Sequence, residues 1–143
     1  MCEHPQRKSA YRAENQGVSI RVLIVEDEAR ARSALHEYLT LQGLEVQSAG
    51  DSQVAIELGL DFQPRILLCD WWLGGTEDGV HVAKALSKAL DGLKVIFMTG
   101  HSRENLARLI SGLEVKGIYQ KPIQLSDLCT AIDTISNQEQ GNR

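Results

Sequence analysis

The sequence has little that would cross-link the chain or hold it in a membrane. Its three cysteines, Cys2, Cys69 and Cys129, are an odd number at wide spacing, which favours a reducing compartment over a disulfide framework. No apolar run approaches the roughly 18 residues of a membrane-spanning helix. The first 17 residues are polar, so we expect no signal peptide. Together these absences predict a cytoplasmic protein.

Charge of one sign is not in large excess either. The chain carries 15 basic and 19 acidic residues, a formal net charge of -4, which gives no long-range attraction to nucleic acid or to an anionic membrane. We therefore expect neither as a direct partner. The apolar fraction of 43% and the charged fraction of 24% are typical of a globular domain, and 143 residues suffice for one such domain.

Short apolar runs alternate with segments of helical periodicity. The runs are rich in valine, isoleucine and leucine, typical of strands buried on both faces, and lie at residues 21–25, 44–48, 66–69, 95–98 and 117–119. Five segments that follow these runs are predicted to be helices. Two are identified by their length, at about 52–62 and about 79–90. Three have an apolar face, formed by Ala34, Leu35, Tyr38 and Leu39; by Leu106, Leu109, Ile110 and Leu113; and by Leu125, Leu128, Cys129, Ile132 and Ile135. Strict alternation predicts an α/β fold, a doubly wound parallel sheet with right-handed crossovers.

The two ends of the chain lack this pattern. Residues 1–19 have no periodicity, and we expect a mobile N-terminal extension there. Residues 137–143 are expected to form a frayed C-terminal tail. The domain itself is predicted at 20–136, which leaves no room for an attached DNA-binding or catalytic domain.

Charged and hydroxyl side chains follow four of the five apolar runs. They are Glu26, Asp27 and Glu28 after the first run, Asp70 after the third, Thr99 with Gly100 after the fourth, and Lys121 after the fifth. In an open parallel sheet the carboxyl ends of the strands meet at one edge, where ligands bind. The polarity of loops explains any one of these residues but explains the whole set poorly. We therefore expect one acidic pocket at this edge.

The residue types in this pocket suit phosphoryl chemistry. Three neighbouring carboxylates raise one another's pKa unless a cation intervenes, and oxygen ligands select a hard ion such as Mg²⁺ (or Mn²⁺). Lys121 and the Thr99 hydroxyl are suited to phosphoryl oxygens, while Gly100 leaves the backbone open to close approach. Asp70 would then be the nucleophile that forms an acyl phosphate.

Four segments resemble the signature segments of the response-regulator receiver family. They are VLIVEDE (22–28), ILLCDWWLGG (66–75), VIFMTG (95–100) and QKPI (120–123), and the similarity extends over about 20–136. The resemblance implies a flavodoxin-like (βα)5 fold with strand order 2-1-3-4-5. It implies a two-component regulator that accepts a phosphoryl group from a sensor histidine kinase or a histidine phosphotransfer protein. Such a domain is not an enzyme, beyond catalysing its own phosphorylation and slow dephosphorylation, and it signals by phosphorylation-dependent protein binding.

The resemblance also implies a role for each site residue. Asp70 matches the phosphoacceptor, Asp27 the direct Mg²⁺ ligand, Glu26 the acid that acts through a coordinated water, and the Trp72 backbone carbonyl the third metal ligand. Thr99 matches the hydroxyl that moves toward the phosphoryl group, and Lys121 the lysine that pairs with it. By the same resemblance the Lys121–Pro122 bond is expected to be cis.

Some positions depart from the family pattern or vary within it. Gly74 and Gly75 stand where a proline is common, and Asp78-Gly79 falls one residue late. Ile118 occupies the position of the switch aromatic, with Tyr119 one residue later and so expected on the opposite face of the strand. Trp72 and His101 match positions that flank the attacking water, and Trp72 is expected to slow hydrolysis. By the resemblance, the output surface for a downstream protein is expected at about 102–136. A homodimer is a further possible partner.

Two other functions remain open at this level. A hydrolase of the haloacid-dehalogenase type also uses an aspartyl phosphate, but it needs a general acid two residues after the nucleophile, where Trp72 stands here. A pure interaction module that no longer takes phosphate is the other. The intact acids, hydroxyl and lysine argue against it.

Overall fold

The structure is a computed structural model that describes residues 19–73, 78–100 and 110–141. Its elements, in chain order, are β1 (Arg21–Val25), α2 (Ala29–Leu41), β2 (Glu45–Ala49), α3 (Ser52–Phe62), β3 (Ile66–Asp70), α4 (Asp78–Ala89), β4 (Lys94–Thr99), β5 (Val115–Gln120) and α6 (Leu125–Gly141). The expected N-terminal extension, apart from its last residue, and the Gly74-Gly75 loop lie outside the described residues. So do His101 and most of the expected fourth helix.

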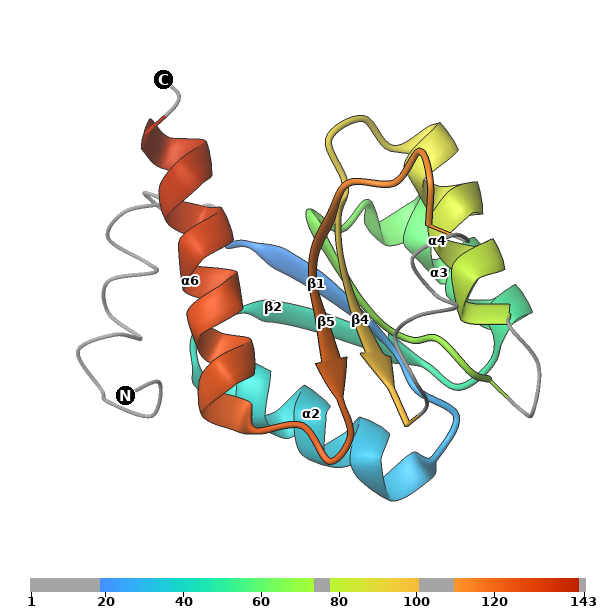
Figure 1. Cartoon of the computed structure of the whole chain (residues 1–143), viewed down its shortest axis with the longest axis horizontal. Helices are drawn as coiled ribbons and strands as arrows, with labels where there is room; N and C mark the ends of the chain where they lie inside the picture. The colour runs from blue at the N-terminus through green and yellow to red at the C-terminus, as the bar shows by residue number, and fades with distance from the viewer. Residues whose placement is uncertain (1–18, 74–77, 101–109, 142–143) are drawn as a thin grey trace.

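The five strands form one parallel sheet in the order β2-β1-β3-β4-β5. The predicted fold class and strand order are therefore confirmed. Helices α2 and α6 cover one face of the sheet, and α3 and α4 cover the other (Figure 1). Among the described residues, no helix combines the length and apolar character needed to cross a bilayer.

The sheet separates two hydrophobic cores. The α3/α4 core contains Leu23, Leu67 and Phe97 from the strands, and the α2/α6 core contains Ile24, Leu68 and Met98. Neighbouring residues of one strand enter different cores because side chains alternate between the faces. All five residues of β3 are buried, so this strand is apolar up to Asp70.

Side chains at the carboxyl edge of the sheet start two of the helices. Glu28 is the N-cap of α2, where its carboxylate accepts a hydrogen bond from the Ala31 N–H at 2.8 Å. Asp51 caps α3 in the same way, accepting from the Val54 N–H at 2.8 Å. Each acid satisfies a backbone donor that has no partner within the helix. Both helices therefore begin directly beside the ends of β1 and β2.

Three details differ from the sequence-based expectations. Ala34 is exposed, because the buried stripe of α2 centres on Leu35 and Leu39 and Ala34 lies beside it. Leu125, the first residue of α6, is 36% exposed, whereas the rest of its stripe is buried. β5 is longer than 117–119, and an irregularity in its pairing with β4 occurs where Val95 pairs with Val115 and Ile96 with Gly117.

Candidate functional site

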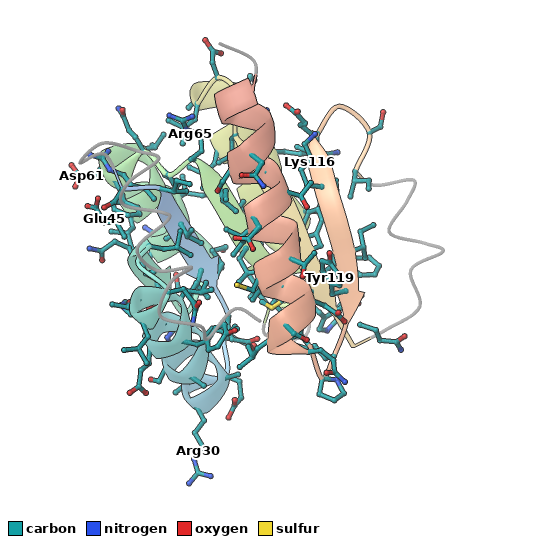
Figure 2. The ribbon with its side chains drawn as sticks, turned by 90° about the vertical axis from the view of Figure 1, so that its left-hand side faces the viewer. Arg30, Glu45, Asp61, Arg65, Lys116 and Tyr119 are labelled. Carbon is teal, nitrogen blue, oxygen red and sulfur yellow. The ribbon has the colours of Figure 1, made fainter. Side chains whose placement is uncertain are left out.

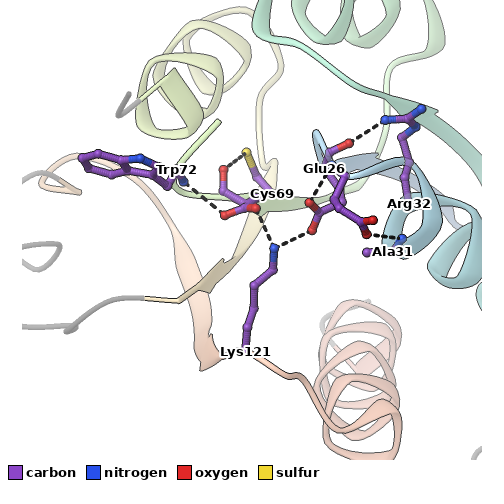
Figure 3. A network of polar contacts seen from close by, with 8 residues as sticks. Glu26, Ala31, Arg32, Cys69, Trp72 and Lys121 are labelled. Atoms are coloured by element: carbon purple, nitrogen blue, oxygen red, sulfur yellow. Dashed lines mark hydrogen bonds and ion pairs between the residues drawn. The ribbon is translucent and has the colours of Figure 1, made fainter. Parts of the chain in front are cut away.

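The ends of β1, β3 and β5 bring Glu26, Asp70 and Lys121 into direct contact. The Lys121 ammonium lies 2.7 Å from Asp70 Oδ2 and 2.8 Å from Glu26 Oε1 (Figure 3). Since β5 is an edge strand, with β4 between it and β3, the long lysine side chain spans the distance to the central strands. The Lys121–Pro122 bond is cis, as expected.

Asp70 is buried at the end of the central strand β3, with both carboxylate oxygens engaged. Oδ1 accepts a hydrogen bond from the Trp72 N–H at 3.1 Å, and Oδ2 accepts from Lys121. Beneath it, the Cys69 thiol donates to the Asp70 carbonyl at 3.4 Å. Burial, with the nearby charges of Asp70 and Glu26, raises the pKa of Cys69 well above its ordinary value, so this residue is a neutral donor and no nucleophile.

Glu26 is fully buried, with both carboxylate oxygens close to other polar groups of the site. Its Oε2 accepts a hydrogen bond from the Glu28 N–H at 3.0 Å, and its Oε1 faces Lys121. Burial raises the pKa of Glu26, and the contacts with Lys121 and Glu28 only partly offset this increase. Burial lowers the pKa of Lys121, but the hydrogen bonds and attraction to Asp70 and Glu26 outweigh it, so its pKa is raised overall.

Asp27 adds an exposed carboxylate to the acidic cluster. Its exposed carboxylate offers an oxygen that lies, with one oxygen each from Glu26 and Asp70, in a group whose members are all within 4.8 Å of one another. Three carboxylate oxygens gathered in this way form an oxygen-only donor set, which fits a hard divalent cation. The residues present therefore fit a metal of the Mg²⁺ type.

Thr99 and Gly100 lie at the end of β4, between the ends of β3 and β5. Thr99 is buried, and its backbone carbonyl accepts a hydrogen bond from the Lys121 N–H at 2.8 Å. Gly100 is exposed, and among the described residues, its chain neighbours aside, a Cβ on it would meet no atom within 4 Å. His101 follows directly and is outside the described residues.

The two tryptophans after Asp70 have different environments. Trp71 is buried in the α3/α4 core, which fits a packing role. Trp72 is half-buried, and its indole meets that of Trp71 edge to face with ring centroids 6.1 Å apart. Trp72 therefore lies at the edge of this core, with its backbone N–H directed toward Asp70 (Figure 3).

Ile118 and Tyr119 face opposite sides of β5, as the strand periodicity predicts. Ile118 packs against the α3/α4 core, and Tyr119 packs against the α2/α6 core, where Figure 2 shows it beside α6. The Tyr119 ring lies over Gly117, since a Cβ at Gly117 would come within 2.6 Å of it. The aromatic side chain is thus directed away from the face that Ile118 occupies.

Two contacts of the pocket were not found by sequence reasoning. The Arg32 guanidinium of α2 donates to the Glu26 backbone carbonyl at 2.8 Å. Gly79 of α4 lies so close to the end of β3 that a Cβ on it would be 2.1 Å from the Asp70 carbonyl oxygen. Both join the end of a strand to the helix that follows it, and periodicity carries no signal for such contacts. The displaced Asp78-Gly79 pair was the one available hint.

Comparison with known proteins agrees with this geometry. The model of the response regulator receiver domain family matches residues 22–133. The N-terminal domain of a response regulator/sensory box/GGDEF 3-domain protein from Carboxydothermus hydrogenoformans is similar with a TM-score of 0.75 and 26% identity, over 85% of this chain and 98% of that one. A CheY-like receiver domain protein from Methanospirillum hungatei shares the fold, with a TM-score of 0.78 and 22% identity over 87% of this chain and 98% of that one.

Curated relatives include longer proteins. The transcriptional regulatory protein PdtaR of Mycobacterium tuberculosis is 34% identical over 115 residues, which are 79% of this chain and 55% of that protein. PhoB, the phosphate regulon transcriptional regulatory protein of Pseudomonas aeruginosa, is 34% identical over 66% of this chain and 41% of its own length. The chain spans about half the length of the relatives it matches. Because the family model matches most of the sequence and the strand order is the same, the chain belongs to the family of response regulator receiver domains of two-component systems.

Proposed function

We propose that Asp70 accepts a phosphoryl group from a phosphohistidine, carried by a sensor histidine kinase or a histidine phosphotransfer protein. The main support is the position of Lys121, whose ammonium contacts both Asp70 and Glu26 and so supplies a cation beside the candidate nucleophile. A phosphoryl group on Asp70 would bring new negative charge next to this ammonium. The same ion pair holds the Asp70 carboxylate in a fixed orientation.

The acidic cluster is the proposed Mg²⁺ site of this reaction, with Mn²⁺ as a substitute. Asp27 and Asp70 would bind the ion directly, Glu26 through a coordinated water, and Trp72 through its backbone carbonyl. When bound, the ion neutralises the charge that gathers around the transferred group. The clustering of the three carboxylates supports this assignment.

The transfer itself is a displacement at phosphorus. An Asp70 oxygen forms the new P–O bond as the P–N bond of phosphohistidine breaks, and the bonding pair leaves with the imidazole. Lys121 and the Thr99 hydroxyl bind the phosphoryl oxygens, and Gly100 leaves room for them. The chain therefore catalyses only its own phosphorylation and, more slowly, the hydrolysis of its acyl phosphate.

The output is proposed to be phosphorylation-dependent binding of a protein target. The surface at about 102–136, which includes β5 and α6, would be read by that target or by a second copy of the chain. Thr99 is the proposed first element of the switch. Since Ile118 stands on the face where an aromatic is usual and Tyr119 packs beside α6, an aromatic swing on the Ile118 face is not part of the proposal.

Incubation with Mg²⁺ and acetyl phosphate, a small phosphodonor, is expected to add one phosphoryl group. Intact mass spectrometry should show a gain of about 80 Da. Asp70→Asn should lose this gain completely, because an amide is not a comparable nucleophile. Removal of Mg²⁺ with a chelator should suppress it.

The matched control is Asp61→Asn, an exposed carboxylate near the end of α3, which should retain the full mass gain. An unchanged gain in Asp70→Asn would refute Asp70 as the acceptor. The absence of any gain in the unaltered chain, with a phosphohistidine donor as well, would favour a pure interaction module.

Trp72 is expected to prolong the life of the acyl phosphate. Its bulky, half-buried indole is proposed to restrict the approach of water to the acyl phosphate. Trp72→Asn should shorten the half-life by about tenfold, which corresponds to ~1.4 kcal/mol in the activation free energy of hydrolysis. Trp72→Phe keeps a bulky ring and should stay near the original half-life. Loss of the mass gain over time measures both, and an unchanged half-life in Trp72→Asn would contradict the role.

A further inference from the structure

Arg32 reaches from the second turn of α2 back to the ends of β1 and β2. Its Nη1 donates a hydrogen bond to the backbone carbonyl of Glu26 at 2.8 Å (Figure 3). The guanidinium also lies against Gly50, the residue after β2, because a Cβ at Gly50 would be 2.7 Å from Nη1 and 3.3 Å from Cζ. A residue with a side chain at position 50 would therefore displace the guanidinium.

The carbonyl that Arg32 binds belongs to the peptide joining Glu26 to Asp27. In the preceding peptide, which joins Val25 to Glu26, the Glu26 N–H donates to the Ala49 carbonyl of β2 at 3.1 Å. The backbone of Glu26 is thus held on one side by the sheet and on the other by Arg32. Fixing this peptide fixes the backbone direction at which Asp27 begins, and hence where its carboxylate can lie.

A third contact lies within the short segment between β1 and α2. The Glu28 N–H donates to Glu26 Oε2 at 3.0 Å, so the buried carboxylate is oriented by the same short segment. If the Glu26 carbonyl loses its donor, the segment has one fewer restraint, and we expect this hydrogen bond to weaken. The protection of the Glu28 amide therefore reports on the Arg32 contact.

We infer that Arg32 is a positioning residue for the acidic cluster: its contact with the Glu26 carbonyl, made possible by Gly50, sets Glu26 and Asp27 for cation binding. The inference rests on the proposed Mg²⁺ site. It makes no use of the charge of Arg32. A positive charge near the cluster would by itself oppose the binding of a second cation.

The direction in which Mg²⁺ affinity changes in Arg32→Met therefore separates the effect of the Arg32 charge from its positioning effect. If only its charge mattered, Arg32→Met would strengthen Mg²⁺ binding. If Arg32 positions the carboxylates, the same variant weakens Mg²⁺ binding by about ten- to a hundredfold, the range for residues that orient metal ligands. Arg32→Lys keeps the charge but lacks the planar fork, and should also weaken binding.

Gly50→Ala perturbs the same contact from another element. It keeps Arg32 and every charge, and its new Cβ meets only the end of a long side chain, so the fold can accommodate it. It should weaken Mg²⁺ binding in the same direction, and adding it to Arg32→Met should have little further effect. The matched control is Arg30→Met on the same helix, whose side chain points away from the domain (Figure 2).

The test is a Mg²⁺ titration monitored by tryptophan fluorescence, since the backbone N–H of Trp72 donates to the Asp70 carboxylate. Amide hydrogen exchange of Glu28 is measured in parallel on the metal-free chain. Exchange should accelerate in Arg32→Met and Gly50→Ala but not in Arg30→Met. Unfolding free energies, measured without metal, show how much each variant destabilises the domain.

Tighter or unchanged Mg²⁺ binding in Arg32→Met, with or without a loss of stability, would overturn the inference. So would unchanged exchange of the Glu28 amide. If the unaltered chain shows no saturable Mg²⁺ binding, the proposed metal site fails. In that case the exchange of Glu28 alone decides whether Arg32 holds this loop.

Discussion

Gly79→Ala is expected to lower the free energy of unfolding by about 3 kcal/mol or more, beyond the usual range for overpacking. A Cβ at Gly79 would lie 2.1 Å from the Asp70 carbonyl oxygen, 2.7 Å from the Trp71 carbonyl oxygen and 2.8 Å from the Trp71 Cα. All three atoms are backbone of a buried segment, so no rotamer change relieves the clash. The first turn of α4 would have to move off the end of β3.

The sign of this effect is opposite to the ordinary one. Within a helix, glycine to alanine usually stabilises by about 1 kcal/mol. Gly79 is the second residue of α4, and its N–H donates to the Trp71 carbonyl at 3.1 Å, a bond that the shift would break. Urea denaturation of the metal-free domain measures the change.

Gly92→Ala and Gly100→Ala are the controls for the loss of unfolding free energy in Gly79→Ala. Gly92 has a φ of 78° and open space around it, so alanine there should cost only about 1 kcal/mol. Gly100 has open space and no such φ, and alanine there should be nearly neutral. A loss in Gly79→Ala no greater than that in Gly92→Ala would show that α4 shifts easily.

Lys121→Met is expected to destabilise the metal-free domain by about 2–3 kcal/mol at neutral pH, the lower end of the effect of breaking a buried ion pair. The side chains of Glu26 and Asp70 are 0% and 5% exposed, so both would be left without their cation. The Lys121 side chain itself is 31% exposed, and water screening reduces the loss. Urea denaturation in the presence of a chelator measures it.

The loss in Lys121→Met should depend on pH. Because the pKa of Glu26 is raised in the folded state, its ionisation lowers stability as pH rises from the ordinary glutamate pKa through the folded one. Without Lys121 this pKa rises further, so the penalty grows and extends to higher pH. Below the ordinary glutamate pKa, Glu26 is neutral in both states and the difference between variant and parent narrows. The raised pKa of Lys121 keeps it charged throughout this range.

Lys116→Met is the matched control for this experiment. It removes the same charge from β5, the strand that Lys121 directly follows, but its partner is the half-exposed Glu114 at 3.4 Å. The loss should stay below about 1 kcal/mol and vary little between about pH 5 and pH 8. Equal losses in the two variants, or a pH-independent loss in Lys121→Met, would contradict the account of Glu26.

The sequence predicted the elements that have a simple periodicity. The strands at β1, β3 and β4 have consecutive apolar residues because both faces of the sheet are covered, and their ends could be placed within one residue. From there, the rule that ligands gather at the carboxyl edge predicted that Glu26, Asp70 and Lys121 would meet. β5 was placed too short because, as an edge strand, it is only half-buried and its apolar pattern is weak.

Contacts between segments distant in sequence could not be predicted in this way. Ala34 was placed on the buried face of α2 because periodicity defines an arc of the helix and not where the sheet ends beneath it. Gly79 and Gly50 matter through the atoms that a Cβ would meet, and those belong to other elements. Periodicity describes neighbours along the chain, whereas the residues that support a site from other helices and strands are brought there by tertiary packing.

The separation of the hydrophobic interior into two cores has a consequence for how such a domain can diversify. The side chains of each strand alternate between the α2/α6 core and the α3/α4 core. A change in side-chain volume in one core therefore alters few contacts in the other core. Each layer of helices can therefore exchange its packing residues without compensating changes across the partition. Helices on one face can thus be remodelled while the helices on the opposite face keep their packing against the strands.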